Sequence, residues 1–78
     1  MLNAKETLNL ISKQWCTLDD IMSLAGVGKN NALKIRKDIQ TLLINQGYIL
    51  PKSLVPMVEV VKYLKIDINY LREMAKEN

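Results

Sequence analysis

Residues 17–35 read TLDDIMSLAGVGKNNALKI and place a short glycine-containing turn between two segments with helical periodicity. Thr17 followed three residues later by Asp20 is a capping signal that begins the first helix. The inward-facing residues of this helix should be Leu18, Ile21, Met22 and Ala25. Gly26 then suits the left-handed backbone position that ends a helix. The stretch therefore predicts two helices joined by a tight turn.

The second helix is expected to run from about residue 28 to residue 45 and to have two contrasting faces. Its core stripe should consist of Ala32, Ile35, Ile39, Leu42 and Leu43. The opposite face carries polar side chains at the spacing i, i+4, i+7, i+11, namely Asn30, Lys34, Lys37 and Thr41. We expect one side of this helix to pack on the core and the other to expose a straight polar stripe.

Further helices are expected on either side of this unit. Asn3 and Glu6 form a capping box for a first helix, whose buried stripe should be Ala4, Leu8, Ile11 and Trp15. Pro56 suits the first position of a later helix, with an inner face of Met57, Val60, Val61 and Leu64. Asp67 caps a last helix that turns inward Ile68, Leu71 and Ala75. Four residues lie outside these stripes, either as ordinary core or as a surface for self-association: Val58, Tyr63, Tyr70 and Met74.

Two short segments after the long helix favour β-structure. Residues 48–50 and 54–55 flank Pro51, Lys52 and Ser53, which predicts a small hairpin with Lys52 near its tip. We therefore expect a mainly α fold, consisting of one helix-turn-helix domain over residues 1–78 with four to five helices and a short β-hairpin wing.

Composition argues against an enzyme. The 78 residues suffice for one small domain, and the chain has no histidine, one cysteine and no acid cluster at metal-ligand spacing. Asp19 and Asp20 are adjacent, so on a helix they point about 100° apart and form no carboxylate pair. Cys16 is expected to be a small buried hydrophobe beside Trp15. We expect no catalytic residue, metal or cofactor. With neither a membrane span nor a signal sequence, the protein should be cytoplasmic, in a bacterial cell or phage-infected host.

The positive charge is concentrated. The formal net charge is +3, and residues 29–37 contain no acid but hold Lys29, Lys34, Arg36 and Lys37. Such clustering is typical of a surface that binds a polyanion, although a merely solvated helix face has the same composition.

The opening stretch resembles the helix-turn-helix of bacterial repressors, particularly the lac-repressor-type headpiece. The resemblance rests on Thr17, Leu18, Asp20, Ala25, Gly26 and Val27, followed by Ala32 and Ile35 at the apolar positions of the second helix. It departs from that pattern at Met22, where the family often has a smaller residue. The resemblance implies that the second helix enters the major groove of double-stranded DNA.

The same turn also resembles the helix-hairpin-helix, whose core reads L-x-G-x-G-x-x-x-A-x-x-I. The matching residues are Leu24, Gly26, Gly28, Ala32 and Ile35. That family binds a phosphate through the amides of the glycine turn without reading bases. Two features weigh against this alternative: the family favours proline where this chain has Ala25, and the polar stripe extends far along the helix.

Residues 47–66, GYILPKSLVPMVEVVKYLKI, are similar to winged segments of small DNA-binding proteins from Gram-positive phages and integrative elements, some excisionase-like and others regulators. That similarity implies DNA as the partner, together with a homodimer or a recombinase or regulatory protein. A small protein-binding module, such as an antirepressor or enzyme inhibitor, is the alternative from a different class.

Roles follow for individual residues in the helix-turn-helix interpretation. The candidates for contacts with base edges are Lys29, Asn30, Leu33 and Lys34. Contacts with the DNA backbone are expected from Asn31, Lys37 and Thr41, and Lys52 would reach a phosphate or the minor groove. We interpret Thr17 mainly as a helix cap, and Lys13, Lys62 and Lys65 as solubilising charges.

Overall fold

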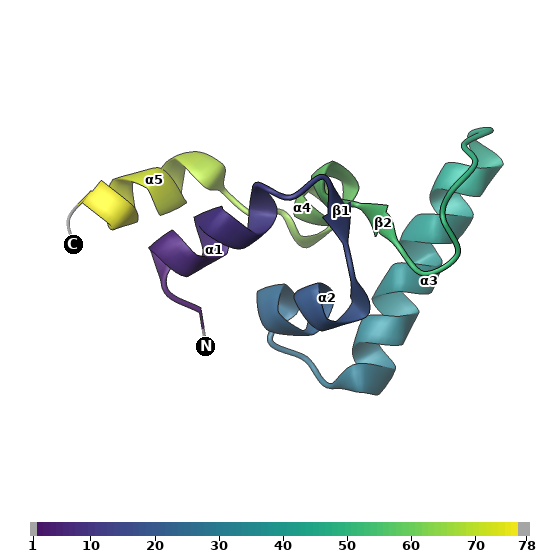
Figure 1. Cartoon of the computed structure of the whole chain (residues 1–78), viewed down its shortest axis with the longest axis horizontal. Coiled ribbons are helices and arrows are strands. Elements are labelled where there is room, and N and C mark those ends of the chain that lie inside the picture. Colours follow the sequence, from purple (N-terminus) through teal and green to yellow (C-terminus); the bar gives the residue numbers. More distant parts are fainter. Residues whose placement is uncertain (1, 77–78) are drawn as a thin grey trace.

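The computed structural model describes residues 2–76 and is mainly helical, as the sequence predicts (Figure 1). The elements in chain order are α1 (Ala4–Ile11), β1 (Trp15–Cys16), α2 (Leu18–Ala25), α3 (Lys29–Asn45), β2 (Val55–Pro56), α4 (Met57–Leu64) and α5 (Ile68–Lys76). The molecule measures 41 × 24 × 17 Å along its principal axes. Helices α1 and α5 pack together at one end of the long axis, and α3 lies at the other (Figure 1).

The fully buried apolar residues come from the elements between these two ends. They are Cys16, Ile21, Ala32, Ile39, Leu43, Val55, Met57 and Val60. Among the described residues, α1 and α5 contribute half-buried side chains at most. The core therefore joins α2, α3 and α4 through the two strands, while α1 and α5 cover each other at its edge.

Local capping explains where several helices begin. The Asn3 side chain accepts a hydrogen bond from the Glu6 backbone N–H at 2.8 Å, and the Glu6 carboxylate accepts one from the Asn3 N–H at 3.2 Å. The Asp67 carboxylate accepts a hydrogen bond from the Tyr70 N–H at 3.0 Å at the start of α5. The capping signals expected at Asn3 and Asp67 are thus confirmed.

The sheet is formed by different residues from those expected. Strand β1 pairs with β2 in antiparallel register, with Trp15 opposite Pro56 and Cys16 opposite Val55. Residues 48–50 form no strand, so the predicted hairpin between 48–50 and 54–55 is wrong. The reason lies in burial: Cys16 and Val55 are both fully buried, so their pairing closes the core. An isolated two-stranded hairpin with an exposed face would be marginal.

Three further expectations need correction. Helix α1 ends at Ile11, and Trp15 lies in β1 instead of extending the helical stripe. Pro56 precedes α4 in an extended conformation and is not its first helical residue. Leu42 was expected in the core but is 50% exposed, because α3 turns this position toward the edge of the packed surface. The residues outside the stripes are exposed and are not ordinary core: Val58, Tyr63, Tyr70 and Met74.

Within residues 2–76, no helix has both the length and the apolar content needed to cross a lipid bilayer.

Candidate nucleic-acid interface

A capped and tightly closed turn sets the position of α3 relative to α2. The Thr17 hydroxyl accepts a hydrogen bond from the Asp20 N–H at 3.1 Å, and the Asp20 carboxylate accepts one from the Thr17 N–H at 3.0 Å. Gly26 ends α2 in the left-handed conformation, with φ of 66°. The N–H groups of Gly26 and Val27 both donate to the Met22 carbonyl, at 3.0 and 3.2 Å. These contacts give the turn one defined geometry and confirm the predicted C-cap.

Gly28 is the N-cap of α3, and its carbonyl accepts the first helical hydrogen bond from the Ala32 N–H at 3.0 Å. Val27 packs against the core between the two helices. The predicted boundaries of α3 agree with the observed Lys29–Asn45 to within one residue. The sequence therefore correctly located the turn and the helix that follows it.

Helix α3 separates its buried and polar residues onto opposite sides. Ala32, Ile39 and Leu43 are buried. The polar stripe, which we define as Asn30, Lys34, Lys37 and Thr41, is exposed along its whole length. At 100° per residue this stripe lies almost directly opposite the buried residues. Of the other predicted contacts on α3, Lys29 and Asn31 are exposed and Leu33 is half-buried.

The one acidic residue of α3 lies beside the polar stripe and not within it. The Tyr63 hydroxyl of α4 donates a hydrogen bond to the Asp38 carboxylate at 3.1 Å. This bond raises the pKa of the Tyr63 hydroxyl above its ordinary value. Asp38 is thus held toward α4, so the four residues of the stripe are neutral or positive, but this exposed acid borders them one helical turn after Lys34.

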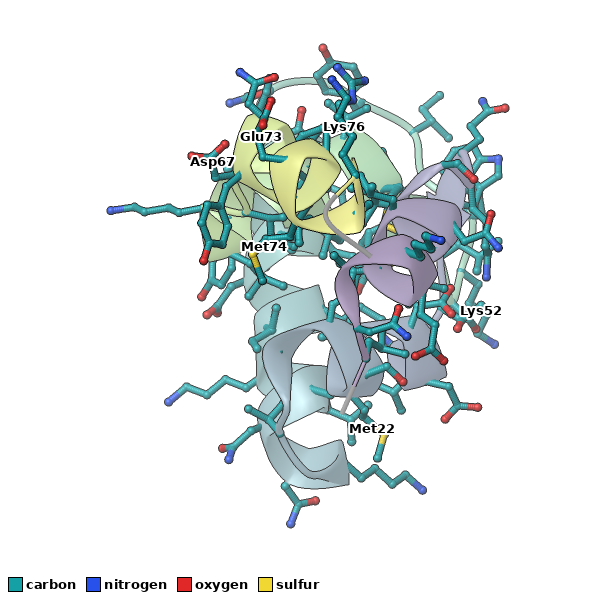
Figure 2. The ribbon with its side chains drawn as sticks, turned by 90° about the vertical axis from the view of Figure 1, so that its left-hand side faces the viewer. Met22, Lys52, Asp67, Glu73, Met74 and Lys76 are labelled. Carbon is teal, nitrogen blue, oxygen red and sulfur yellow. The ribbon has the colours of Figure 1, made fainter. Side chains whose placement is uncertain are left out.

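The segment that contains Lys52 packs along α3 through its backbone carbonyl groups and does not form the tip of a hairpin. The Lys52 carbonyl accepts a hydrogen bond from the Gln40 side chain at 3.4 Å, and the Ser53 carbonyl accepts one from the Arg36 guanidinium at 3.5 Å. Residues 52 and 53 therefore lie along the flank of α3 that Arg36 and Gln40 share. Figure 2 shows Lys52 on the opposite side of the molecule from Asp67 and Met74.

Arg36, which belongs to the positive cluster of residues 29–37, is a further basic residue of this surface beside the predicted DNA contacts. With Lys29 it lines a shallow depression between the start of α2 and residues 53–54. The spacing of Lys29 and Arg36, seven residues apart, places them on one helical face and is the signal that could have identified them. Lys29 and Arg36 thus lie together on the flank of α3 along which the backbone of residues 52–54 runs.

Behind the turn, Asp20 ties α2 to the end of α1. The Lys13 ammonium group lies 2.6 Å from the Asp20 carboxylate, which is largely buried. Burial alone would raise the pKa of Asp20, but the hydrogen bonds from Lys13 and Thr17 outweigh it and lower the pKa below its ordinary value. Lys13, expected to be a solubilising charge, is therefore a structural partner of the capped helix.

No group suited to binding a metal ion comes together in the part of the chain that is described. Across residues 2–76, no three side chains among Cys, Asp and Glu gather in one place. Cys16 is fully buried, and burial raises the pKa of its thiol to about 11. A thiol with this pKa remains protonated at neutral pH and is a poor nucleophile.

Comparison with known proteins identified no related protein. No protein-family model matches the sequence, and no curated protein or solved structure is significantly similar to the chain.

Proposed function

We propose that the protein binds double-stranded DNA sequence-specifically by placing the N-terminal part of α3 in the major groove. The observation that carries this proposal is the exposed polar stripe, which is free of acids and lies opposite the buried face of a firmly positioned helix. A helix presented in this way matches the width of the major groove. In this proposal the α2–α3 unit is a helix-turn-helix and needs neither a catalytic residue nor a cofactor.

Side chains near the start of α3 would read the bases. The Asn30 amide can make two hydrogen bonds to adenine, and the Lys34 ammonium group can donate to the acceptors of guanine. Half-buried Leu33 would approach a thymine methyl group, and Lys29 would reach a base edge or phosphate at the groove entrance. These contacts would provide the sequence preference.

A second set of side chains would hold the DNA backbone. On α3 these are Asn31, Lys37 and Thr41, all of them exposed. The backbone of Lys52 lies along the flank of α3, from which its side chain would reach a neighbouring phosphate, and Arg36 would add a positive charge on the same flank. Phosphate contacts of this kind fix the orientation of the protein and make its affinity depend on salt.

The hydrogen bonds of the turn limit which amides a helix-hairpin-helix clamp could use. The Gly26 and Val27 N–H groups both donate to the Met22 carbonyl, so a clamp would have to use the amides from Gly28 onward, where α3 begins without a side-chain cap. Base readout by α3 needs only side chains that already face outward. A protein-binding module, the remaining alternative, would have no need of an acid-free stripe.

The proposed biological setting rests on the resemblance of residues 47–66 to winged segments of phage and integrative-element proteins. We infer a cytoplasmic regulator or excisionase-like factor of a phage or mobile element. Such a factor acts at its own DNA sites, with a second copy, a recombinase or a regulatory protein as partner. A single module of this size covers on the order of 600–1,000 Å² of its own surface on DNA, so tight binding benefits from a second contact.

A binding titration with two duplexes at two salt concentrations tests the proposal. One duplex is the DNA that flanks the gene of this protein, and the other is a scrambled sequence of equal length. We expect a preference for the flanking DNA that persists as salt rises. Equal binding that collapses with salt would favour the phosphate clamp, and absence of binding to both would favour a protein partner.

A pair of double variants tests where DNA binds. Lys34→Ala with Lys37→Ala removes two charges from the polar stripe. The matched control, Lys5→Ala with Lys76→Ala, removes two exposed charges from α1 and α5, so both variants lower the formal net charge of +3 by the same amount. Only the stripe variant should lose DNA affinity strongly, and equal losses would contradict the proposed groove contact.

A further inference from the structure

An uncharged apolar tip stands at the C-terminal end of α3. We define the α3 tip as Ile44, Tyr48 and Ile49. These residues are 59%, 59% and 97% exposed, respectively. Residues 39–51 contain no charged side chain, so the tip is bounded by Asp38 on one side and Lys52 on the other. In Figure 1 the end of α3 and the loop after it project from the body, at the opposite end of the long axis from α5.

Backbone hydrogen bonds hold the tip in a defined shape. The Tyr48 N–H donates to the Leu43 carbonyl at 3.0 Å, and the Gly47 N–H donates to the Ile44 carbonyl at 3.0 Å. Gly47 has φ of 92°, a conformation that side-chain-bearing residues rarely adopt. The turn thus keeps Tyr48 beside the end of the helix, with Ile49 directly after it, which lowers the entropy cost of burying the tip against a partner.

From this tip we infer that two copies of the chain associate through a two-fold axis at the α3 tips. Three large side chains at these exposures offer on the order of 400 Å² of mostly apolar surface, the size at which such patches mark interaction sites. One side of a standard interface covers about 800 Å², of which about 65% is apolar in homodimers. The tip supplies most of that apolar share.

Charge also favours a second copy as the occupant. The chain carries a formal net charge of +3, and its basic residues on α3 end at Lys37, before the uncharged segment begins. Two copies can therefore meet at the tips with their basic surfaces kept apart. A partner selected by charge, acidic or basic, would find no group on the tip with which to pair.

The position of the tip fits a paired DNA site, a point that rests on the proposed function. Ile44 follows Thr41 by three residues and so continues the line of the polar stripe. The base-reading residues at the start of α3 lie about 13 residues, or about 20 Å, before its end. Two copies joined at their tips with the two α3 axes at an angle can hold these residues up to about 40 Å apart, which includes the separation of about 34–36 Å between half-sites one DNA turn apart.

Sedimentation velocity without DNA tests the association itself. The parent chain should show a monomer–dimer equilibrium over a wide concentration range. Ile49→Asp should weaken self-association at least about tenfold, because it puts a charge into a two-fold apolar contact. The matched control is Val58→Asp on α4, at a position that is 62% exposed. It should associate like the parent. Both sites are exposed, and circular dichroism would verify that both variants fold.

The possible outcomes separate the two proposals. A parent chain that stays monomeric, or an Ile49→Asp variant that dimerises like the parent, overturns the tip interface. A monomeric Val58→Asp beside an unchanged Ile49→Asp overturns it in favour of the surface on α4. If the tip dimer forms but binds no duplex with paired half-sites, the association stands and the DNA-binding proposal fails. If the parent binds DNA but stays a monomer, the DNA-binding proposal stands and the tip interface fails.

Discussion

At the scale of single residues, Asp20 has two structural roles, since it caps α2 and also pairs with Lys13. Its carboxylate accepts hydrogen bonds from the Lys13 ammonium group at 2.6 Å and from the Thr17 N–H at 3.0 Å. The capping interaction was readable from the sequence because Thr17 and Asp20 are three residues apart. The Lys13 contact was not, since nothing local requires the chain before β1 to turn back toward α2.

Acid should weaken the fold through Asp20. The pKa of Asp20 in the folded protein lies below its value in the unfolded chain, about 4, so its ionised form stabilises the fold above that pH. This contribution should disappear as the pH falls from about 4 through the lower folded-state pKa. Asp20→Asn should reduce the free energy of unfolding by about 1–2 kcal/mol at neutral pH and by less in acid. Urea titrations at both pH values measure this, with exposed Asp19→Asn as the control. Identical pH dependence in the two variants would contradict the assignment.

The two glycines of the turn should respond differently to alanine. Gly26 has φ of 66°, so Gly26→Ala should lower the free energy of unfolding by about 1–2 kcal/mol. Gly28 has φ of −78°, and an added methyl group there would meet no other atom within 4 Å. Gly28→Ala should therefore leave the thermal unfolding temperature nearly unchanged. A large loss of stability at Gly28 would mean that the turn is packed differently.

At the scale of elements, α3 shows which features of a helix its sequence periodicity can predict. Its boundaries and its polar stripe were predicted from the sequence, but its core stripe was one residue too wide at Leu42. Ile39 is 1% exposed, so Ile39→Ala should cost about 2–5 kcal/mol in stability. Leu42→Ala should cost well under about 1 kcal/mol, because that residue is half exposed. Chemical denaturation of both variants checks this, and equal losses would place Leu42 in the core after all.

Different residues of the polar stripe of α3 should contribute to DNA sequence specificity and to general DNA affinity. Under the proposed function, Lys37→Ala should weaken binding to all duplexes and reduce the slope of log affinity against log salt by about 1. Asn30→Ala should instead reduce discrimination against a single changed base pair, by about 1–3 kcal/mol. Titrations against a set of single-substitution duplexes distinguish the two effects. A uniform loss for Asn30→Ala would remove it from the base-reading set.

At the scale of the whole molecule, stability is distributed unevenly. The described core joins β1, α2, α3, β2 and α4, whereas α1 and α5 hold no fully buried residue among those described. Amide hydrogens of α1 and α5 should therefore exchange faster than those in the middle of α3, through openings that leave the core intact. Hydrogen exchange followed by NMR measures this. Equal protection in all helices would show that α1 and α5 unfold only with the core.

The candidate interface was partly predictable for the same reason that α3 was. Residues on one helix have fixed angular relations, so the stripe from Asn30 to Thr41 could be located without tertiary information. The contributions of Lys52 and Arg36 depend on how residues 51–54 return along α3, which the sequence misassigned to a hairpin. Contacts between segments distant in the sequence depend on which apolar residues pack into the same core, and local sequence patterns do not specify this.

By itself, the sequence determined where α1, α2, α3 and α5 begin and where α2 ends. Hydrogen bonds between residues three or four apart set the caps at Asn3 and Thr17, and the absence of a side chain allows the left-handed turn at Gly26. Tertiary structure alone decided that Trp15 and Cys16 pair with Val55 and Pro56, and that Leu42 lies outside the core. Local preferences act within a few residues, whereas strand pairing and burial depend on the surface that the rest of the chain provides.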